Sequence, residues 1–99
     1  MRPRRLILVI EKDPVVLSCW MMALSVNGYR VVGVHDLEQA KQAMREHPID
    51  AVHARKMIAN DFRVPVIVSD NMSETISKLK ITLWNAPRKA NPSQSPSQP

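Results

Sequence analysis

Few side chains in this sequence could carry out chemistry, and their types and spacing exclude several kinds of site. His35, His47 and His53 have neither the i, i+4 spacing nor the cysteine neighbours of a zinc site. Cys19 is the only cysteine and has no histidine near it in sequence, so we interpret it as a small core residue and not as a nucleophile. With two glycines in total, the chain cannot form a glycine-rich loop that cradles nucleotide phosphates. The sequence therefore predicts no zinc, no nucleotide cofactor and no enzymatic activity.

The net charge of +5 is concentrated at the two ends of the chain. The basic residues there are Arg2, Arg4, Arg5, Arg88 and Lys89. The rest of the chain, residues 6–87, holds nine basic and nine acidic residues. Because a nucleic-acid-binding domain usually gathers its cations on one face of a folded element, we interpret the charge as solubilising. Weak, salt-dependent association with nucleic acid through the basic ends is the alternative.

The length of 99 residues provides for a single domain. We assign residues 1–85 to this domain. Residues 86–99 are rich in proline, serine and glutamine and lack large apolar side chains, so we expect a disordered tail. The longest apolar run near the start, residues 6–10, is too short to cross a bilayer or to act as a secretory signal. Since a single cysteine also fits a reducing compartment, we expect a cytoplasmic protein that does not enter membranes.

Apolar periodicity predicts alternating strands and helices. The predicted strands are residues 6–10, 29–34, 49–54, 64–68 and 80–84. The first is a continuous run of apolar residues, which is typical of a strand buried on both faces of a parallel sheet. Helices are predicted after Asp13-Pro14, after Asp36 and over residues 71–79, and the first two follow an aspartate, a favoured N-cap. This order predicts an α/β fold with right-handed crossovers.

This order and several segments resemble the receiver domain of two-component response regulators. Residues 6–14, Leu-Ile-Leu-Val-Ile-Glu-Lys-Asp-Pro, are similar to the first strand of that family and the acidic cluster after it. Gly28–Val31, Pro48–Val52 and Val64–Val68 are similar to its entries into strands two and three and to its fourth strand. The resemblance covers roughly residues 5–85. It implies a flavodoxin-like, three-layer αβα fold with strand order 2-1-3-4-5.

Two helices of that family are reduced in this chain. Arg55 to Arg63 spans nine residues, so the third helix would be shortened to a turn or two. The fifth helix would be missing, because the polar tail stands in its place. We therefore expect a parallel sheet of four to five strands.

The resemblance also implies a chemistry, phosphoryl transfer from a histidine kinase to an aspartate that ends the third strand. In the family, two acidic residues after the first strand help to hold Mg²⁺, and a hydroxyl residue and a lysine grip the phosphoryl oxygens. In this chain the acidic positions fall on Glu11 and Lys12, with Asp13 next, and the phospho-acceptor position falls on Arg55. Ser69 roughly matches the hydroxyl position, and the lysine has no counterpart. The resemblance thus points to a degenerate receiver.

Arg55 carries a fixed positive charge and cannot accept a phosphoryl group. We expect it to pair with Glu11 and Asp13 where Mg²⁺ would otherwise bind, and so to hold the site in one state. The alternative is that Arg55 faces solvent and the two acids cap the following helix. The chain is therefore predicted to be a pseudo-receiver, a signalling module that binds another protein without phosphorylation, metal or catalysis.

A second function remains open, that of a working receiver in a phosphorelay. In that case Mg²⁺ would bind, and a shifted aspartate, Asp50, Asp61 or Asp70, would accept the phosphoryl group. The missing lysine and the cation at position 55 argue against this function.

The missing fifth helix also predicts where a protein partner would bind. Without that helix, three apolar residues of the predicted strand 80–84, Ile81, Leu83 and Trp84, would be uncovered. Exposed apolar area often marks an interface, and tryptophan is favoured at interface hot spots. We expect an unidentified signalling protein, or a second copy of the chain in a homodimer, to bind this face.

Overall fold

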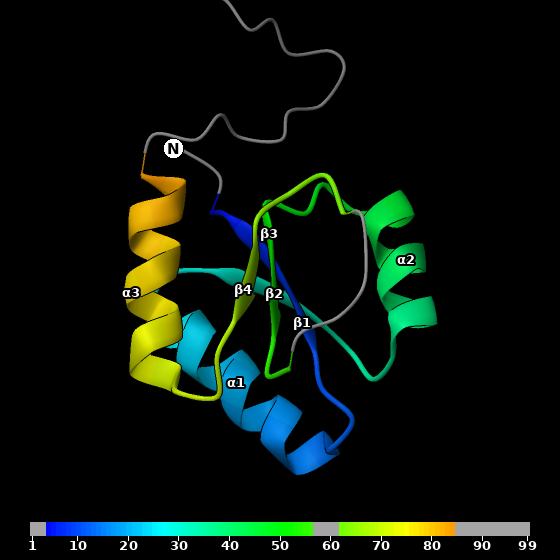
Figure 1. Ribbon diagram of the computed structural model, residues 1–99, viewed down its shortest axis with the longest axis horizontal. Coiled ribbons are helices and arrows are strands. Elements are labelled where there is room, and N and C mark those ends of the chain that lie inside the picture. Colours follow the sequence, from blue (N-terminus) through cyan, green and yellow to red (C-terminus); the bar gives the residue numbers. More distant parts are fainter. Residues whose placement is uncertain (1–3, 57–61, 85–99) are drawn as a thin grey trace, which may run out of the picture.

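A computed structural model describes residues 4–56 and 62–84, which form a parallel sheet with helices on both faces (Figure 1). The strands are β1 (Leu6–Ile10), β2 (Arg30–Val34), β3 (Ala51–Ala54) and β4 (Val66–Val68). The helices are α1 (Pro14–Val26), α2 (Leu37–Glu46) and α3 (Met72–Leu83). The strand order is β2-β1-β3-β4, and every neighbouring pair is parallel. This arrangement confirms the predicted flavodoxin-like α/β fold, with four strands in the described part of the chain.

The central strand β1 is buried on both faces, as its unbroken apolar sequence predicts. Ile7, Leu8 and Val9 have no exposed surface. Successive side chains of a strand point to opposite faces, so Ile7 and Val9 belong to one core cluster and Leu8 belongs to the other. The two clusters lie on opposite sides of the sheet, one beneath α1 and α3 and the other beneath α2 (Figure 1).

Helix α1 begins and ends where the sequence signals predict. Asp13 is the N-cap, and its Oδ1 accepts hydrogen bonds from the backbone N–H groups of Val15 and Val16. Gly28 follows the helix with a φ of 93°, a conformation that favours glycine. On β2, Gly33 allows close packing of α1, because a Cβ atom there would lie 2.7 Å from the sulfur of Met21. These features seat α1 directly against the sheet.

The segment 80–84 does not form the predicted fifth strand. Residues 80–83 continue α3, which runs for 12 residues from its N-cap Asn71. The buried residues Thr75, Leu79 and Leu83 recur every four positions and therefore lie on one face of this helix. Because residues 80–84 contain no glycine or proline, nothing in the sequence ends the helix directly after Leu79. A short apolar run fits a strand or a helix equally well, and the tertiary packing selects the helix.

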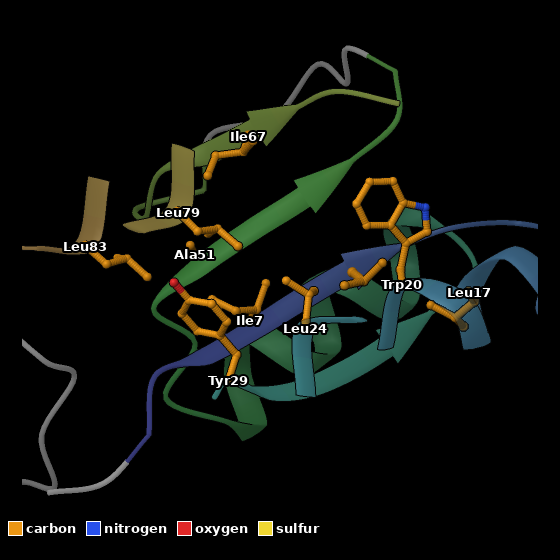
Figure 2. Packing of buried hydrophobic residues seen from close by; sticks show 10 residues of the cluster. Ile7, Leu17, Trp20, Leu24, Tyr29, Ala51, Ile67, Leu79 and Leu83 are labelled. Carbon is orange, nitrogen blue, oxygen red and sulfur yellow. The ribbon is translucent and has the colours of Figure 1, made fainter. Parts of the chain in front are cut away.

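The segment that was predicted to be an uncovered strand is part of α3, and this helix packs on the sheet. Leu79 and Leu83 pack in the same cluster as Ile7 and Ala51, and Figure 2 shows their side chains turned toward the sheet. Leu83 is only 5% exposed, so its assignment to an uncovered interface is wrong. The other two residues of that predicted interface are exposed at the end of the helix, Ile81 at 78% and Trp84 at 81%.

Several predictions fall outside the described residues. These are the tail 86–99, Asp61, and most of the shortened third crossover. Within the described ranges, no helix is both long enough and apolar enough to cross a membrane.

Candidate functional site

A cleft of about 330 Å³ opens at the carboxyl ends of β1 and β3, next to the start of α2. In parallel α/β sheets this edge is the usual position of a ligand site. The lining residues are Ile10, Glu11, Lys12, His35, Asp36, Leu37, Ala54, Arg55 and Lys56. Most of the charged residues that the sequence singled out for the phosphoryl site are therefore adjacent in space.

Arg55 and Glu11 form a two-point ion pair across the ends of β3 and β1. The Arg55 Nε atom lies 2.6 Å from Glu11 Oε1, and the Arg55 Nη2 atom donates to Glu11 Oε2 at 3.2 Å. Two parallel N–H···O contacts of this kind are the strong geometry of an arginine–carboxylate pair. The Glu11 side chain is 4% exposed and the Arg55 side chain 42%, so the acid is buried and the guanidinium covers it.

Asp13 has a different role from Glu11. Its carboxylate caps α1, while its backbone N–H donates to Glu11 Oε2 at 3.0 Å. The structure therefore places Asp13 as a helix cap and Glu11 as the partner of Arg55. The expected pairing with Arg55 thus describes Glu11, and the alternative of a helix cap describes Asp13.

These residues do not fit a Mg²⁺ ion. A hard cation needs carboxylate oxygens that are open to it, but both oxygens of Glu11 face the Arg55 guanidinium. The second acidic position of the receiver pattern is occupied by the cation Lys12. In the described part of the chain, no group of three or more His, Cys, Asp or Glu side chains is arranged to hold a metal.

Ser69 follows β4, but its hydroxyl group is engaged with the start of α3. Its Oγ donates to Glu74 Oε1 at 2.7 Å and accepts from the Asn71 N–H at 3.0 Å. The hydrogen bond from Ser69 and the nearby Lys78 ammonium lower the pKa of Glu74. The spacing Asn71-x-x-Glu74 is a helix-start signal in the sequence, and it is the feature that could have predicted this network.

His53 is a fully buried polar residue on β3. It has no exposed surface, and its ring packs against the ring of Trp20, with the two centroids 4.0 Å apart and the ring planes tilted by 36°. Its Nε2 lies 2.9 Å from the carbonyl oxygen of Ser69. Since a carbonyl only accepts, Nε2 carries the hydrogen, and Nδ1 is left buried without a partner among the described residues. Burial lowers the pKa of His53, and the neutral ring is the stable form.

Asp50 lies far from the cleft, at the amino end of β3. Its Oδ2 accepts the Leu6 N–H at 2.8 Å, and its Oδ1 lies 3.7 Å from Arg5 Nη1. The side chain is 7% exposed. Among the three aspartates named as shifted acceptors, Asp50 is therefore at the wrong end of the sheet, and Asp70 is exposed just after β4.

Comparisons with known proteins support the fold but assign no family. No protein-family model matches the sequence, and no curated protein matches it. The solved structures that are similar in fold include two response regulators. A response regulator from Thermotoga maritima has a TM-score of 0.62 at 11% identity, over 84% of this chain and 100% of that chain. The orphan response regulator HP1043 of H. pylori has a TM-score of 0.61 at 14% identity, over 82% of this chain and 99% of that chain. The chain therefore has the receiver fold of response regulators.

Proposed function

We propose that this chain is a pseudo-receiver, a signalling module that uses the shape of a receiver to bind protein and does not accept a phosphoryl group. The proposal starts from the receiver fold that it shares with solved response regulators. Because one fold hosts many functions, the residues of the site must distinguish a pseudo-receiver from a working receiver.

The contact between Arg55 and Glu11 is the observation that carries the proposal. The Nε–Oε1 distance of 2.6 Å places a fixed cation at the carboxyl end of β3, on the buried acid that follows β1. Separating the pair would leave the buried Glu11 carboxylate without its counter-charge, which is costly. A phosphoryl donor or Mg²⁺ would therefore have to displace a strong internal partner.

Other residues around the cleft support the same function. The Ser69 hydroxyl is bonded to Glu74, and the two lysines beside Arg55 and Glu11, Lys56 and Lys12, offer no carboxylate oxygen for a metal. We expect no catalysis from this arrangement, and action in the cytoplasm through contact with a protein. Binding of nucleic acid by the basic ends is the weaker candidate, because residues 6–87 between those ends hold as many acidic as basic residues, nine of each.

Incubation with acetyl phosphate and Mg²⁺, followed by intact-protein mass spectrometry, tests the proposal. The wild-type chain is expected to stay unmodified. A stoichiometric phosphoryl adduct would contradict the proposal and favour a working receiver, and peptide mapping would then assign it to Asp50, Asp61 or Asp70.

Two variants sharpen this experiment. Arg55→Asp combined with Lys12→Asp restores the acidic positions of the receiver pattern, and any gain of labelling in this variant would assign the block to those two cations. Arg45→Asp on the exposed face of α2 makes one such charge reversal away from the cleft, and it is expected to remain unlabelled.

A further inference from the structure

Helix α1 has an exposed apolar face that the fold itself does not use. Val15, Met22 and Val26 are 71%, 69% and 80% exposed, and Cys19 is also exposed. At 100° per residue these four side chains lie within a narrow stripe on the side opposite the buried Leu17, Trp20 and Leu24. The earlier interpretation of Cys19 as a core residue is therefore wrong, and the cysteine lies in the middle of the stripe.

The stripe is unusual because α1 contains no charged residue. The exposed face of α2 carries Glu38, Lys41, Arg45 and Glu46, and that of α3 carries Glu74, Lys78 and Lys80. Those two helices have ordinary solvated faces. Only α1, among the three described helices, presents an apolar face without charge.

The absence of charge favours a second copy of this chain as the partner. Each copy carries a net charge of +5, concentrated at the ends of the chain, so two copies repel one another where those ends meet, and α1 adds no charge to this repulsion. A neutral helix face is a surface on which like-charged copies can approach closely. A partner selected by opposite charge would find no complementary group on α1.

The spacing of the stripe also fits self-association. Positions 15, 19, 22 and 26 are separated by four, three and four residues, which reads the same in both directions. If two α1 helices pack antiparallel about a two-fold axis, Val15 faces Val26 of the other copy and Cys19 faces Met22 of the other copy. Every apolar residue of the stripe then has an apolar partner, as an isologous interface requires.

We propose that α1 is a homodimerisation surface, in which the stripe of Val15, Cys19, Met22 and Val26 packs antiparallel on its copy. This inference rests on the proposed function and deepens it by naming the partner. The surface differs from the Ile81 and Trp84 end of α3, where lysines adjoin the apolar residues.

Sedimentation of the full chain over a range of concentrations, in reducing buffer, tests the dimer. The wild-type chain is expected to dimerise, and Met22→Glu to raise the dissociation constant about tenfold or more, since each dimer then buries two charges. Ser77→Glu on the exposed face of α3 is the control and should dimerise like the wild type. Circular dichroism checks that both variants fold. A wild-type chain that stays monomeric, or Met22→Glu that dimerises normally, would overturn the proposal.

Cysteine cross-linking tests the antiparallel register. In a Cys19→Ser background, Val15→Cys mixed with Val26→Cys should give a disulfide-linked heterodimer under mild oxidation. Val15→Cys alone should not, because in the antiparallel pair the two copies of position 15 are about 16 Å apart along the helix axis at 1.5 Å per residue. Efficient cross-linking of Val15→Cys to itself would overturn the antiparallel arrangement.

The two proposals can fail separately. A monomer that acetyl phosphate does not label overturns the dimer and leaves the pseudo-receiver function in place. A labelled dimer overturns the pseudo-receiver function and leaves the interface in place.

Discussion

At both ends of the sheet, β1 and β3 are connected by the same kind of contact, an arginine paired with a buried carboxylate. At the amino end, Arg5 lies 3.7 Å from Asp50, and its Nη2 also donates to the Leu83 carbonyl oxygen at 3.0 Å. At the carboxyl end, Arg55 contacts Glu11 at 2.6 Å. Both carboxylates also accept a backbone N–H, from Leu6 and from Asp13 respectively.

The difference between the two pairs lies in their burial and their place in the fold. The Arg5 and Asp50 side chains are 13% and 7% exposed, whereas Arg55 is 42% exposed above the 4% exposed Glu11. The amino-end pair ties β1, β3 and α3 together and acts as a structural contact. The carboxyl-end pair occupies the edge where α/β sheets bind ligands. The same kind of contact therefore stabilises the fold at one end of the sheet and, under the proposed function, closes a site at the other.

The largest expected effect is the loss of stability on Asp50→Ala. This change removes the buried carboxylate that accepts the Leu6 N–H and carries the charge opposite Arg5, so we expect the free energy of unfolding to fall by about 3 kcal/mol. Urea denaturation followed by circular dichroism measures it. Asp50→Asn keeps an acceptor for the Leu6 N–H and should lose less. A loss below that of the Glu11 variant described next would reverse the comparison.

A smaller loss is expected at the carboxyl end. Glu11→Gln keeps an oxygen for the Asp13 N–H but removes the charge that pairs with Arg55, whose guanidinium can turn to water. We expect a loss of about 1 kcal/mol in the same urea titration. If Glu11→Gln destabilised the chain as much as Asp50→Ala, the carboxyl-end pair would have to be reinterpreted as a buried structural contact.

The smallest expected effect comes from His53 and depends on pH. Burial lowers the pKa of His53 in the folded chain below the ordinary value of 6.5. As the pH falls, the unfolded chain therefore takes up this proton before the folded chain does. Stability should therefore fall as the pH drops from 7 to 6, by up to about 0.7 kcal/mol from this group. His53→Gln should remove that part of the pH dependence, while His47→Gln, at an exposed position, should retain it. Equal slopes for His53→Gln and the wild type would contradict a neutral buried ring.

Most of the fold could be predicted from the sequence because local signals agree with tertiary packing. The apolar run at β1, the Asp13-Pro14 start of α1 and the Gly28 stop each point to the observed element. The segment 80–84 failed because its apolar residues fit both periods, and only packing of Leu83 against the core selects the helix.

The candidate site could be predicted only where the resemblance placed residues on neighbouring strands. Glu11 and Arg55 follow β1 and β3, so their proximity follows from the strand order. The pairing of Asp50 with Arg5 and the burial of His53 against Trp20 depend on contacts between distant segments, and no local pattern encodes them. Cys19 was assigned to the core because the outer face of α1 is apolar as well. The helical period separates the two faces of α1, but it does not indicate which apolar face is buried.

A Mg²⁺ titration of the wild-type chain, followed through its backbone amide NMR signals, tests most directly whether Arg55 has taken the place of the metal. We expect no saturable shifts at Glu11, Lys12 or Asp13 of the wild-type chain in millimolar Mg²⁺, and saturable shifts in the Arg55→Asp, Lys12→Asp double variant. Saturable Mg²⁺ binding at Glu11 and Asp13 in the wild-type chain would contradict it.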